Sequence, residues 1–173
     1  MSLIQSLVIG AIGSLIASFL FLLILYRLQP KLEISPKIAK TTYDGETVYA
    51  IKVMNSGNRD AVDIRAELLM IEPQVVGGGI GRNILQVSLV RDQWFLLRPM
   101  SKVGDRSGAV FEFITTENLD EEWAKHENSY LLFQVHARDV LSGFARLFSY
   151  EYYSRKVIMN GRFSIGASME IGT

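Results

Sequence analysis

The first 26 residues contain the longest apolar stretch of the chain. No charged side chain occurs from Ser2 to Tyr26. A helix of this length spans about 37 Å at 1.5 Å per residue, whereas the hydrocarbon core of a bilayer is about 30 Å thick. Pro30 follows and cannot continue the helical hydrogen bonds. The pattern predicts a transmembrane helix over residues 1–29 and a separate unit over residues 30–173.

The flanks of this stretch favour a retained span over a cleaved signal peptide. A signal peptide has a basic start, an apolar core of about 7 to 15 residues and a small-residue cleavage site, and none of these features is present. Basic residues gather only on the C-terminal side, at Arg27, Lys31, Lys37 and Lys40. The positive-inside rule therefore places the N-terminus outside and the remainder in the cytoplasm, as a single-pass protein in contact with membrane lipid.

Small side chains lie at helical spacing in the outer half of the predicted span. They are Ser6, Gly10, Gly13, Ser14, Ala17 and Ser18. Small residues let helices pack closely in lipid, which predicts a homo-oligomer assembled through this helix. A heptad-like seam through Ser6, Gly10, Gly13, Ala17, Leu20 and Ile24 extends this interpretation to a pore with a hydrophobic inner constriction. An inert single-pass anchor is the alternative.

After Pro30 the hydrophobic period changes to two. Runs bounded by turn residues occupy residues 48–54, 62–70, 84–90, 94–97, 109–114, 130–138, 144–153 and 162–171. Short strands at this spacing predict an all-β unit, an antiparallel β-sandwich or a Greek-key barrel. Only residues 118–127 have a helical pattern, with Asn118 as the N-cap.

The glycine-rich segment 77–82 invites comparison with a phosphate-binding loop. Such a loop needs a helix after it and a Lys-Ser/Thr pair at its end, and here a predicted strand follows. We therefore expect a mobile connection between two strands. A flexible lip that offers Arg82 and backbone N–H groups to an anion is the alternative.

Composition and charge exclude several classes of activity. The chain has 18 basic and 18 acidic residues, no cysteine and two histidines, and its mean hydropathy is +0.18. Thiolate metal centres, iron–sulfur clusters and cysteine nucleophiles are therefore excluded, and a multi-histidine metal site is disfavoured. His136 and Asp139 lie close in sequence without a placed nucleophile. We expect no enzyme activity, no metal and no cofactor.

Basic and aromatic residues alternate near the C-terminal end. Guanidinium groups bind phosphates and aromatic rings stack on bases, so this pattern predicts a site for a nucleotide or an oligonucleotide. The candidate ligand-binding residues are Arg138, Arg146, Tyr150, Tyr152, Arg155, Lys156 and Arg162. A β-sandwich with core rings and ordinary surface arginines would produce the same pattern.

The segment 153–163, YSRKVIMNGRF, resembles a stretch near the end of the cytoplasmic domain of inward-rectifier potassium channels. That stretch reads Tyr-Ser/Thr-x-x-x-Ile-x-x-Gly-x-Arg-Phe, and this chain has one residue fewer before Arg-Phe. The resemblance implies an immunoglobulin-like β-sandwich that assembles as a ring, usually a tetramer, beneath a membrane pore. This chain has one predicted span, no pore helix and no Thr-x-Gly-Tyr-Gly filter, so selective potassium conduction is not implied.

In architecture and size the chain is similar to single-span membrane effectors of bacterial antiphage systems. The Hailong effector, which resembles an oligodeoxyadenylate-regulated channel, is one comparison. The similarity implies a homo-oligomeric, channel-like effector in the inner membrane whose cytoplasmic domain senses a nucleotide-made ligand. The alternative function is a membrane-tethered protein-interaction module that does not conduct.

Overall fold

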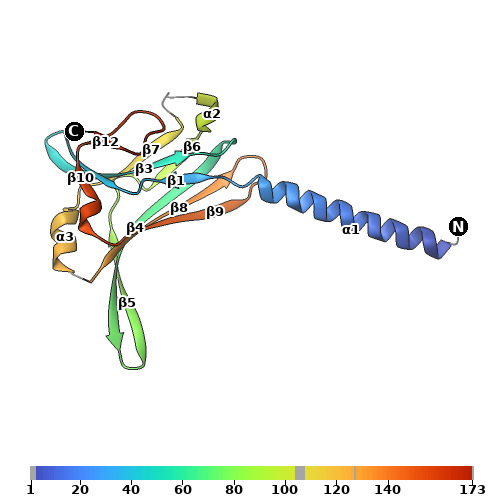
Figure 1. Ribbon diagram of the computed structural model, residues 1–173, viewed down its shortest axis with the longest axis horizontal. Coiled ribbons are helices and arrows are strands. Elements are labelled where there is room, and N and C mark those ends of the chain that lie inside the picture. Colours follow the sequence, from blue (N-terminus) through green and yellow to red (C-terminus); the bar gives the residue numbers. More distant parts are fainter. Residues whose placement is uncertain (1–2, 104–107, 127, 173) are drawn as a thin grey trace.

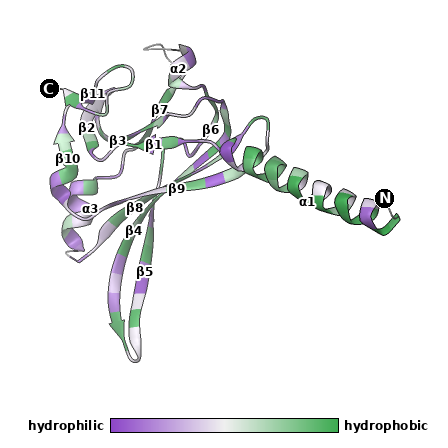
Figure 2. Cartoon of the chain, turned by 45° about the vertical axis from the view of Figure 1, so that its right-hand side comes forward, coloured by the Kyte–Doolittle hydropathy of each residue, from purple (hydrophilic) through white to green (hydrophobic). Residues whose placement is uncertain are grey.

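The computed structural model of the chain describes residues 3–103, 108–126 and 128–172. An N-terminal helix, α1 (Leu3–Arg27), extends away from a unit that is mostly β-sheet (Figure 1). None of the 25 residues of α1 is buried, and the helix is apolar along nearly its whole length (Figure 2). By length and composition, α1 can cross a membrane.

Two five-stranded sheets form most of the β unit. The first contains β1 (Leu32–Ile34), β2 (Ile38–Tyr43), β3 (Glu46–Asn55), β7 (Val110–Thr115) and β10 (Ile158–Asn160). The second contains β4 (Ala61–Val76), β5 (Gly79–Val87), β6 (Gln93–Leu97), β8 (Tyr130–Asp139) and β9 (Ala145–Tyr152). Among the described residues the strands pair antiparallel, as predicted, except that β10 runs parallel to β2.

Side chains from both sheets share one hydrophobic core. In β8, Leu131, Phe133 and Val135 are fully buried, while the residues between them are half-exposed. Phe113 of β7 lies 5.7 Å from Phe133 between ring centroids, which brings the first sheet against the second. The period of two predicted from sequence is thus the alternation between this core and the outer face of each strand.

In the part of the chain that the structure describes, three short helical segments and one small strand pair complete the fold. They are α2 (Met100–Val103), α3 (Leu119–Lys125), the 3-10 helix η1 (Arg155–Val157), and the pair β11 (Arg162–Phe163) and β12 (Ile171–Gly172). Asn118 caps α3 as predicted, because its Oδ1 accepts from the backbone N–H of Glu121 at 3.4 Å. The helix ends at Lys125, and Glu127, which the sequence included, lies outside the described residues.

The C-terminal residues cover the outer face of the first sheet. Phe163 packs on Ala39 and Ala50 in a second, smaller core. Residues 162–171 were expected to form one strand, and this was wrong, because Arg162 and Phe163 form β11 and pair with Gly172 and Ile171 of β12 across an intervening loop. Gly161 allows β12 to lie close to the start of β11. It has φ +131°, and a Cβ there would lie 2.2 Å from the carbonyl oxygen of Gly172.

The glycine-rich segment is the tip of a hairpin and not a loop. Val76 pairs with Gly79, so Gly77 and Gly78 alone make the turn. The pairing of β4 with β8 ends at Ile71, and beyond it β4 and β5 continue as a two-stranded arm that projects from the domain (Figure 1). Expected strands 62–70 and 84–90 were therefore too short at this end.

Candidate functional site

The predicted ligand-binding residues do not form one site within a single chain. Arg138 and Arg146 lie beside the turn between β8 and β9, where Arg138 pairs with Ala145 and Ala137 with Arg146. Arg138 shares the outer phase of β8, whereas Arg146 shares the phase of β9 that faces the core. Because neighbouring strands keep the same phase across the ladder, the two guanidinium groups leave opposite faces of the sheet.

The two tyrosines are core residues. Tyr152 is 1% exposed, its hydroxyl donates to the carbonyl oxygen of Ser35 at 2.7 Å, and burial raises its pKa. Tyr150 is half-buried and its ring lies 4.8 Å from that of Tyr152. The prediction that both rings stack on bases therefore fails for Tyr152, because the alternation of β9 turns this ring into the hydrophobic core.

Arg155, Lys156 and Arg162 lie beyond the other end of β9. Six residue steps separate Arg146 from Tyr152, the last residue of β9, so the strand alone carries the chain over about 20 Å before η1 begins. All three side chains are exposed. Arg162 donates from Nε to Thr41 Oγ1 at 3.2 Å and from Nη2 to the Thr42 carbonyl at 3.0 Å. The predicted set is thus divided between the end of the β unit next to α1, here called the helix-proximal end, and the opposite, helix-distal end.

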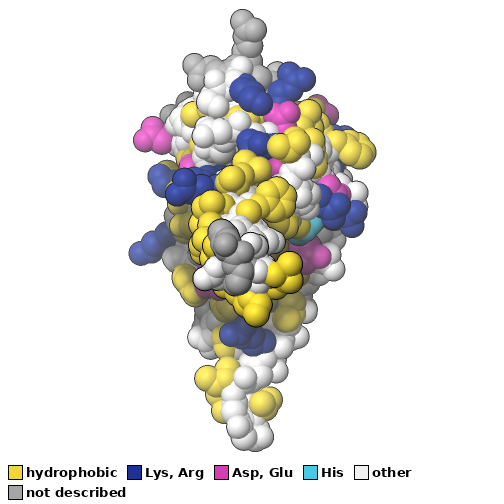
Figure 3. All heavy atoms as spheres, turned by 90° about the vertical axis from the view of Figure 1, so that its right-hand side faces the viewer, with side chains coloured by type: hydrophobic (Ala, Val, Ile, Leu, Met, Phe, Trp, Pro, Cys, Tyr) yellow, Lys and Arg dark blue, Asp and Glu magenta, His cyan; other side chains and the backbone are white. Residues whose placement is uncertain are grey.

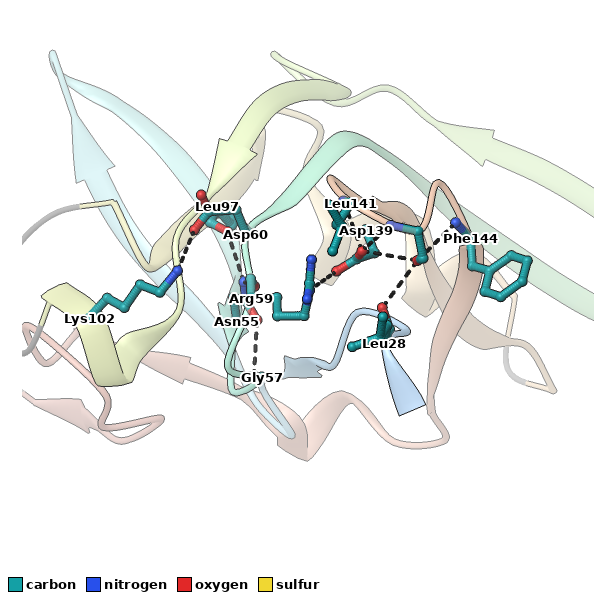
Figure 4. A network of polar contacts seen from close by, with 11 residues as sticks. Leu28, Asn55, Gly57, Arg59, Asp60, Leu97, Lys102, Asp139, Leu141 and Phe144 are labelled. Atoms are coloured by element: carbon teal, nitrogen blue, oxygen red, sulfur yellow. Dashed lines mark hydrogen bonds and ion pairs between the residues drawn. The ribbon is translucent and has the colours of Figure 1, made fainter. Parts of the chain in front are cut away.

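A polar network joins α1 to the β8–β9 turn (Figure 4). The carboxylate of Asp139, which is 1% exposed, accepts from the backbone N–H groups of Leu141 and Ser142 at 3.0 and 2.7 Å. The Ser142 hydroxyl lies 3.0 Å from Asp139 Oδ1 and 3.3 Å from the carbonyl oxygen of Leu28. These contacts connect the residue that follows α1 to the hairpin of the second sheet.

Arg59 completes this network from the turn between β3 and β4. Its Nε donates to Asp139 Oδ2 at 2.9 Å. Buried Asn55 holds the turn, since its Nδ2 donates to the carbonyls of Arg59 and Leu97 at 2.7 and 2.8 Å. Burial alone would raise the pKa of Asp139, but the hydrogen bonds from Ser142, Arg59 and Leu141 outweigh it and keep the pKa below its usual range.

The helix-distal end has a polar cleft of about 520 Å³, lined by Lys40, Glu46, Thr47, Tyr49, Thr116 and Asn118. Lys40 Nζ lies 2.5 Å from Asp120 Oδ2, and the Tyr49 hydroxyl lies 2.9 Å from Asn118 Oδ1 and 3.0 Å from the same Asp120 oxygen. Burial and the neighbouring carboxylate raise the pKa of Tyr49, and the hydrogen bond to Asp120 raises that of Lys40. This network fastens α3 to the first sheet.

We expect Tyr49→Phe to lower the free energy of unfolding by about 1 kcal/mol, because the phenol loses its hydrogen bond to α3 while its ring stays in the core. Urea unfolding of the full chain in detergent, followed by tryptophan fluorescence, measures this change. Tyr43→Phe is the matched control, since Tyr43 is 63% exposed and its substitution should leave stability unchanged. Equal losses in both variants would contradict the assigned role of the Tyr49 hydroxyl.

The junction network contains residues that no sequence motif marks as a site. Asp139 ends a strand and is followed by Ser142 and Gly143, which is the pattern of an Asx turn. That signal identifies a local cap, but the contacts with Arg59 and Leu28 depend on tertiary structure. Within the described residues, no group of three or more His, Cys, Asp or Glu side chains is arranged to hold a metal ion.

No family model and no curated protein matches the chain. Among solved structures, it is similar to Spo0M, a sporulation control protein of Bacillus subtilis, at 14% identity and a TM-score of 0.38, over 72% of this chain and 49% of that one. A Bordetella pertussis protein with the provisional name ApaA is similar at 12% identity and a TM-score of 0.38, over 73% and 96% of the two chains. The chain thus matches about half the length of Spo0M, and likenesses at this level indicate no function.

Proposed function

We propose that this protein is a single-span, homo-oligomeric membrane effector whose β unit is a cytoplasmic sensor domain. The single observation that carries the proposal is the junction at Ser142, whose hydroxyl lies within hydrogen-bond distance of both the Leu28 carbonyl and the Asp139 carboxylate and can donate its one proton to either. Through this junction, a rearrangement of the second sheet reaches the end of α1. The common core of the two sheets favours a sandwich of the immunoglobulin type.

The junction also favours a retained anchor over a cleaved signal sequence. Leu28 directly follows α1, and its carbonyl oxygen lies 3.3 Å from the Ser142 hydroxyl of the folded β unit. Removal of a signal peptide near this point would discard a residue that the domain uses. Together with the basic residues that follow α1, this supports an inner-membrane protein with its N-terminus outside and its β unit in the cytoplasm.

The small residues of α1 support assembly of several copies. At Gly10 and Gly13 the space that a side chain would occupy is open to 4 Å, and no residue of α1 is buried in the described chain. A neighbouring helix would pack closely there, and the seam toward Leu20 and Ile24 would line a channel-like pathway.

The domain would then hold its nucleotide or oligonucleotide ligand at the helix-distal end, through Arg155, Lys156 and Arg162. An effector of this kind would act in antiphage defence.

We expect Gly10→Leu and Ser14→Leu to abolish oligomer formation, because each adds bulk to the close-packing stripe. The mass of the full chain in detergent, measured by light scattering, and toxicity on expression report the effect. Val8→Leu is the matched control: it adds bulk on the opposite side of α1 and should preserve both properties. A monomeric parent protein, or Gly10→Leu variants with unchanged mass and toxicity, would contradict the proposal.

The arm formed by β4 and β5 favours a second candidate, a membrane-tethered protein-interaction module that does not conduct. Val75 and Ile80 pair across the arm and are 92% and 77% exposed, so this segment offers apolar surface to another protein. A simple tether would tolerate Gly10→Leu. Conductance in planar bilayers would separate the two functions, because only the effector requires a membrane pathway.

A further inference from the structure

The turn between β8 and β9 carries exposed apolar side chains at the base of α1. Val140 is 58% exposed, Leu141 69% and Phe144 37%. The backbone of the turn is well held, since Asp139 N donates to the Phe144 carbonyl at 2.9 Å and Gly143 N to the Asp139 carbonyl at 3.0 Å. Apolar side chains are therefore held outside the hydrophobic core by an ordered turn and not by a loose loop.

The turn lies at the level of the last two turns of α1. Phe144 and Ala145 line an apolar cleft of about 380 Å³ together with Phe19, Leu22, Leu23 and Tyr26. The contact between Ser142 and Leu28 also holds the turn beside the C-terminal end of α1. Since α1 exceeds the hydrocarbon thickness by about 7 Å, its last turns reach the interfacial region of the membrane, and the apolar turn reaches it with them.

Basic side chains surround this apolar surface. Arg27 ends α1, Lys31 follows it, and Arg138 and Arg146 lie on the strands that enter and leave the turn, on opposite faces of the sheet. Arg138 Nη2 is 3.9 Å from Asp63 Oδ2, and the Arg146 guanidinium lies 5.1 Å from the Phe148 ring centroid. Seen along α1 from its N-terminal end, hydrophobic side chains gather around the helix, and Lys and Arg side chains lie about them with Asp and Glu side chains in between (Figure 3).

We propose that the β8–β9 turn is a second membrane contact, in which Val140, Leu141 and Phe144 enter the interface and the four cations bind anionic phospholipid headgroups. The inference rests on the proposed membrane span of α1. An apolar centre ringed by cations is the pattern of interfacial membrane binding. A second copy of the chain is a poorer occupant, because it would place two cationic rings against each other.

A depth measurement tests the inference on the full chain. The chain has no cysteine, so a single introduced cysteine carries an environment-sensitive dye such as NBD at a defined position. The three positions are Leu141→Cys in the turn, Ile16→Cys in α1, and Ile165→Cys as a solvent control, because Ile165 is 91% exposed near the helix-distal C-terminal hairpin. The labelled proteins are reconstituted in vesicles of phosphatidylcholine and phosphatidylglycerol that contain a doxyl-labelled lipid quencher.

We expect doxyl lipid to quench the dye at positions 141 and 16 and to leave position 165 unquenched. In vesicles of phosphatidylcholine alone, quenching at 141 should fall while quenching at 16 persists, and Arg138→Gln with Arg146→Gln should produce the same fall. Position 141 behaving like 165 while 16 is quenched would overturn the membrane contact and leave the anchor intact. An unquenched position 16 would overturn the anchor itself. If the dye at position 141 were in an apolar environment but became exposed to water when the protein was diluted with excess lipid, a second copy would be the occupant. That result would overturn the inference.

Discussion

Replacing Asp139 with alanine is expected to lower the free energy of unfolding by about 3 kcal/mol. The substitution removes a buried carboxylate and leaves the Arg59 guanidinium and the N–H groups of Leu141 and Ser142 without an acceptor. Asp139 is buried, whereas the Arg59 side chain is 30% exposed, so the loss comes from the several hydrogen bonds, one of them to a charged group, that end on this carboxylate. Urea unfolding of the full chain in detergent measures it, with buried Trp123 as the fluorescent reporter.

Asp92→Ala is the matched control for this substitution. It removes the same side chain from an exposed position and should leave the free energy of unfolding unchanged. The Asp139→Ala variant should also lose quenching at position 141 in the vesicle assay, because the turn no longer holds its position beside Leu28. An Asp139→Ala protein as stable as Asp92→Ala would contradict the structural role of the junction.

The acid dependence of stability follows from the lowered pKa of Asp139. A carboxylate whose folded pKa lies below its unfolded pKa stabilises the fold fully above the unfolded pKa, about 3.9. That contribution disappears as the pH falls through the folded pKa. Stability should therefore decline below about pH 4, and the decline should be smaller in Asp139→Asn, which does not titrate there.

Much of the fold was predictable because its signals are local. The hydropathy of residues 3–27 and the alternation in β3, β4 and β8 depend on neighbours within one element. The short strands β1, β2 and β10 carry no comparable signal, since they are completed by partners far along the chain. The sequence did not predict the arm as strands, because Val75 and Ile80 are exposed there. The arm has no face toward the core, so the alternation of buried and exposed positions is missing.

The candidate ligand site was less predictable than the fold. Sequence placed Tyr150 and Tyr152 on one phase of a strand, and this is what the structure has, but a phase does not reveal which face is the core. Tyr152 lies in the hydrophobic core, and Tyr150 packs against it. Arg146 and Arg155 are near in sequence, yet the extended strand from Arg146 to Tyr152 puts about 20 Å of chain between them. The predicted site was therefore too compact, because residues close in sequence along a strand are far apart in space.

Lys52 is a buried cation that fastens the C-terminal segment to the first sheet. It is 1% exposed, on the outer face of β3, and its Nζ donates to the carbonyls of Ser164 and Ser168 at 2.7 and 2.8 Å. The Phe163 ring centroid lies 5.8 Å from Nζ. Burial lowers the pKa of Lys52, and the charge of Glu112, its partner in the β3–β7 register, opposes that shift. The ammonium therefore depends on these carbonyls for its solvation.

Lys52→Met is expected to lower the free energy of unfolding by about 2 kcal/mol. Methionine retains the apolar stem, so the packing on Phe163 persists, whereas the Ser164 and Ser168 carbonyls lose their donor. Amide hydrogen exchange should accelerate within residues 163–171 more than in β8, because the lost contacts hold only the C-terminal segment. Lys125→Met, which removes an exposed ammonium paired with Glu121 and Glu122 on the surface of α3, should change neither quantity. A Lys52→Met protein more stable than the parent would show that desolvation of the ammonium exceeds the value of its two hydrogen bonds, and would contradict the role assigned to Lys52.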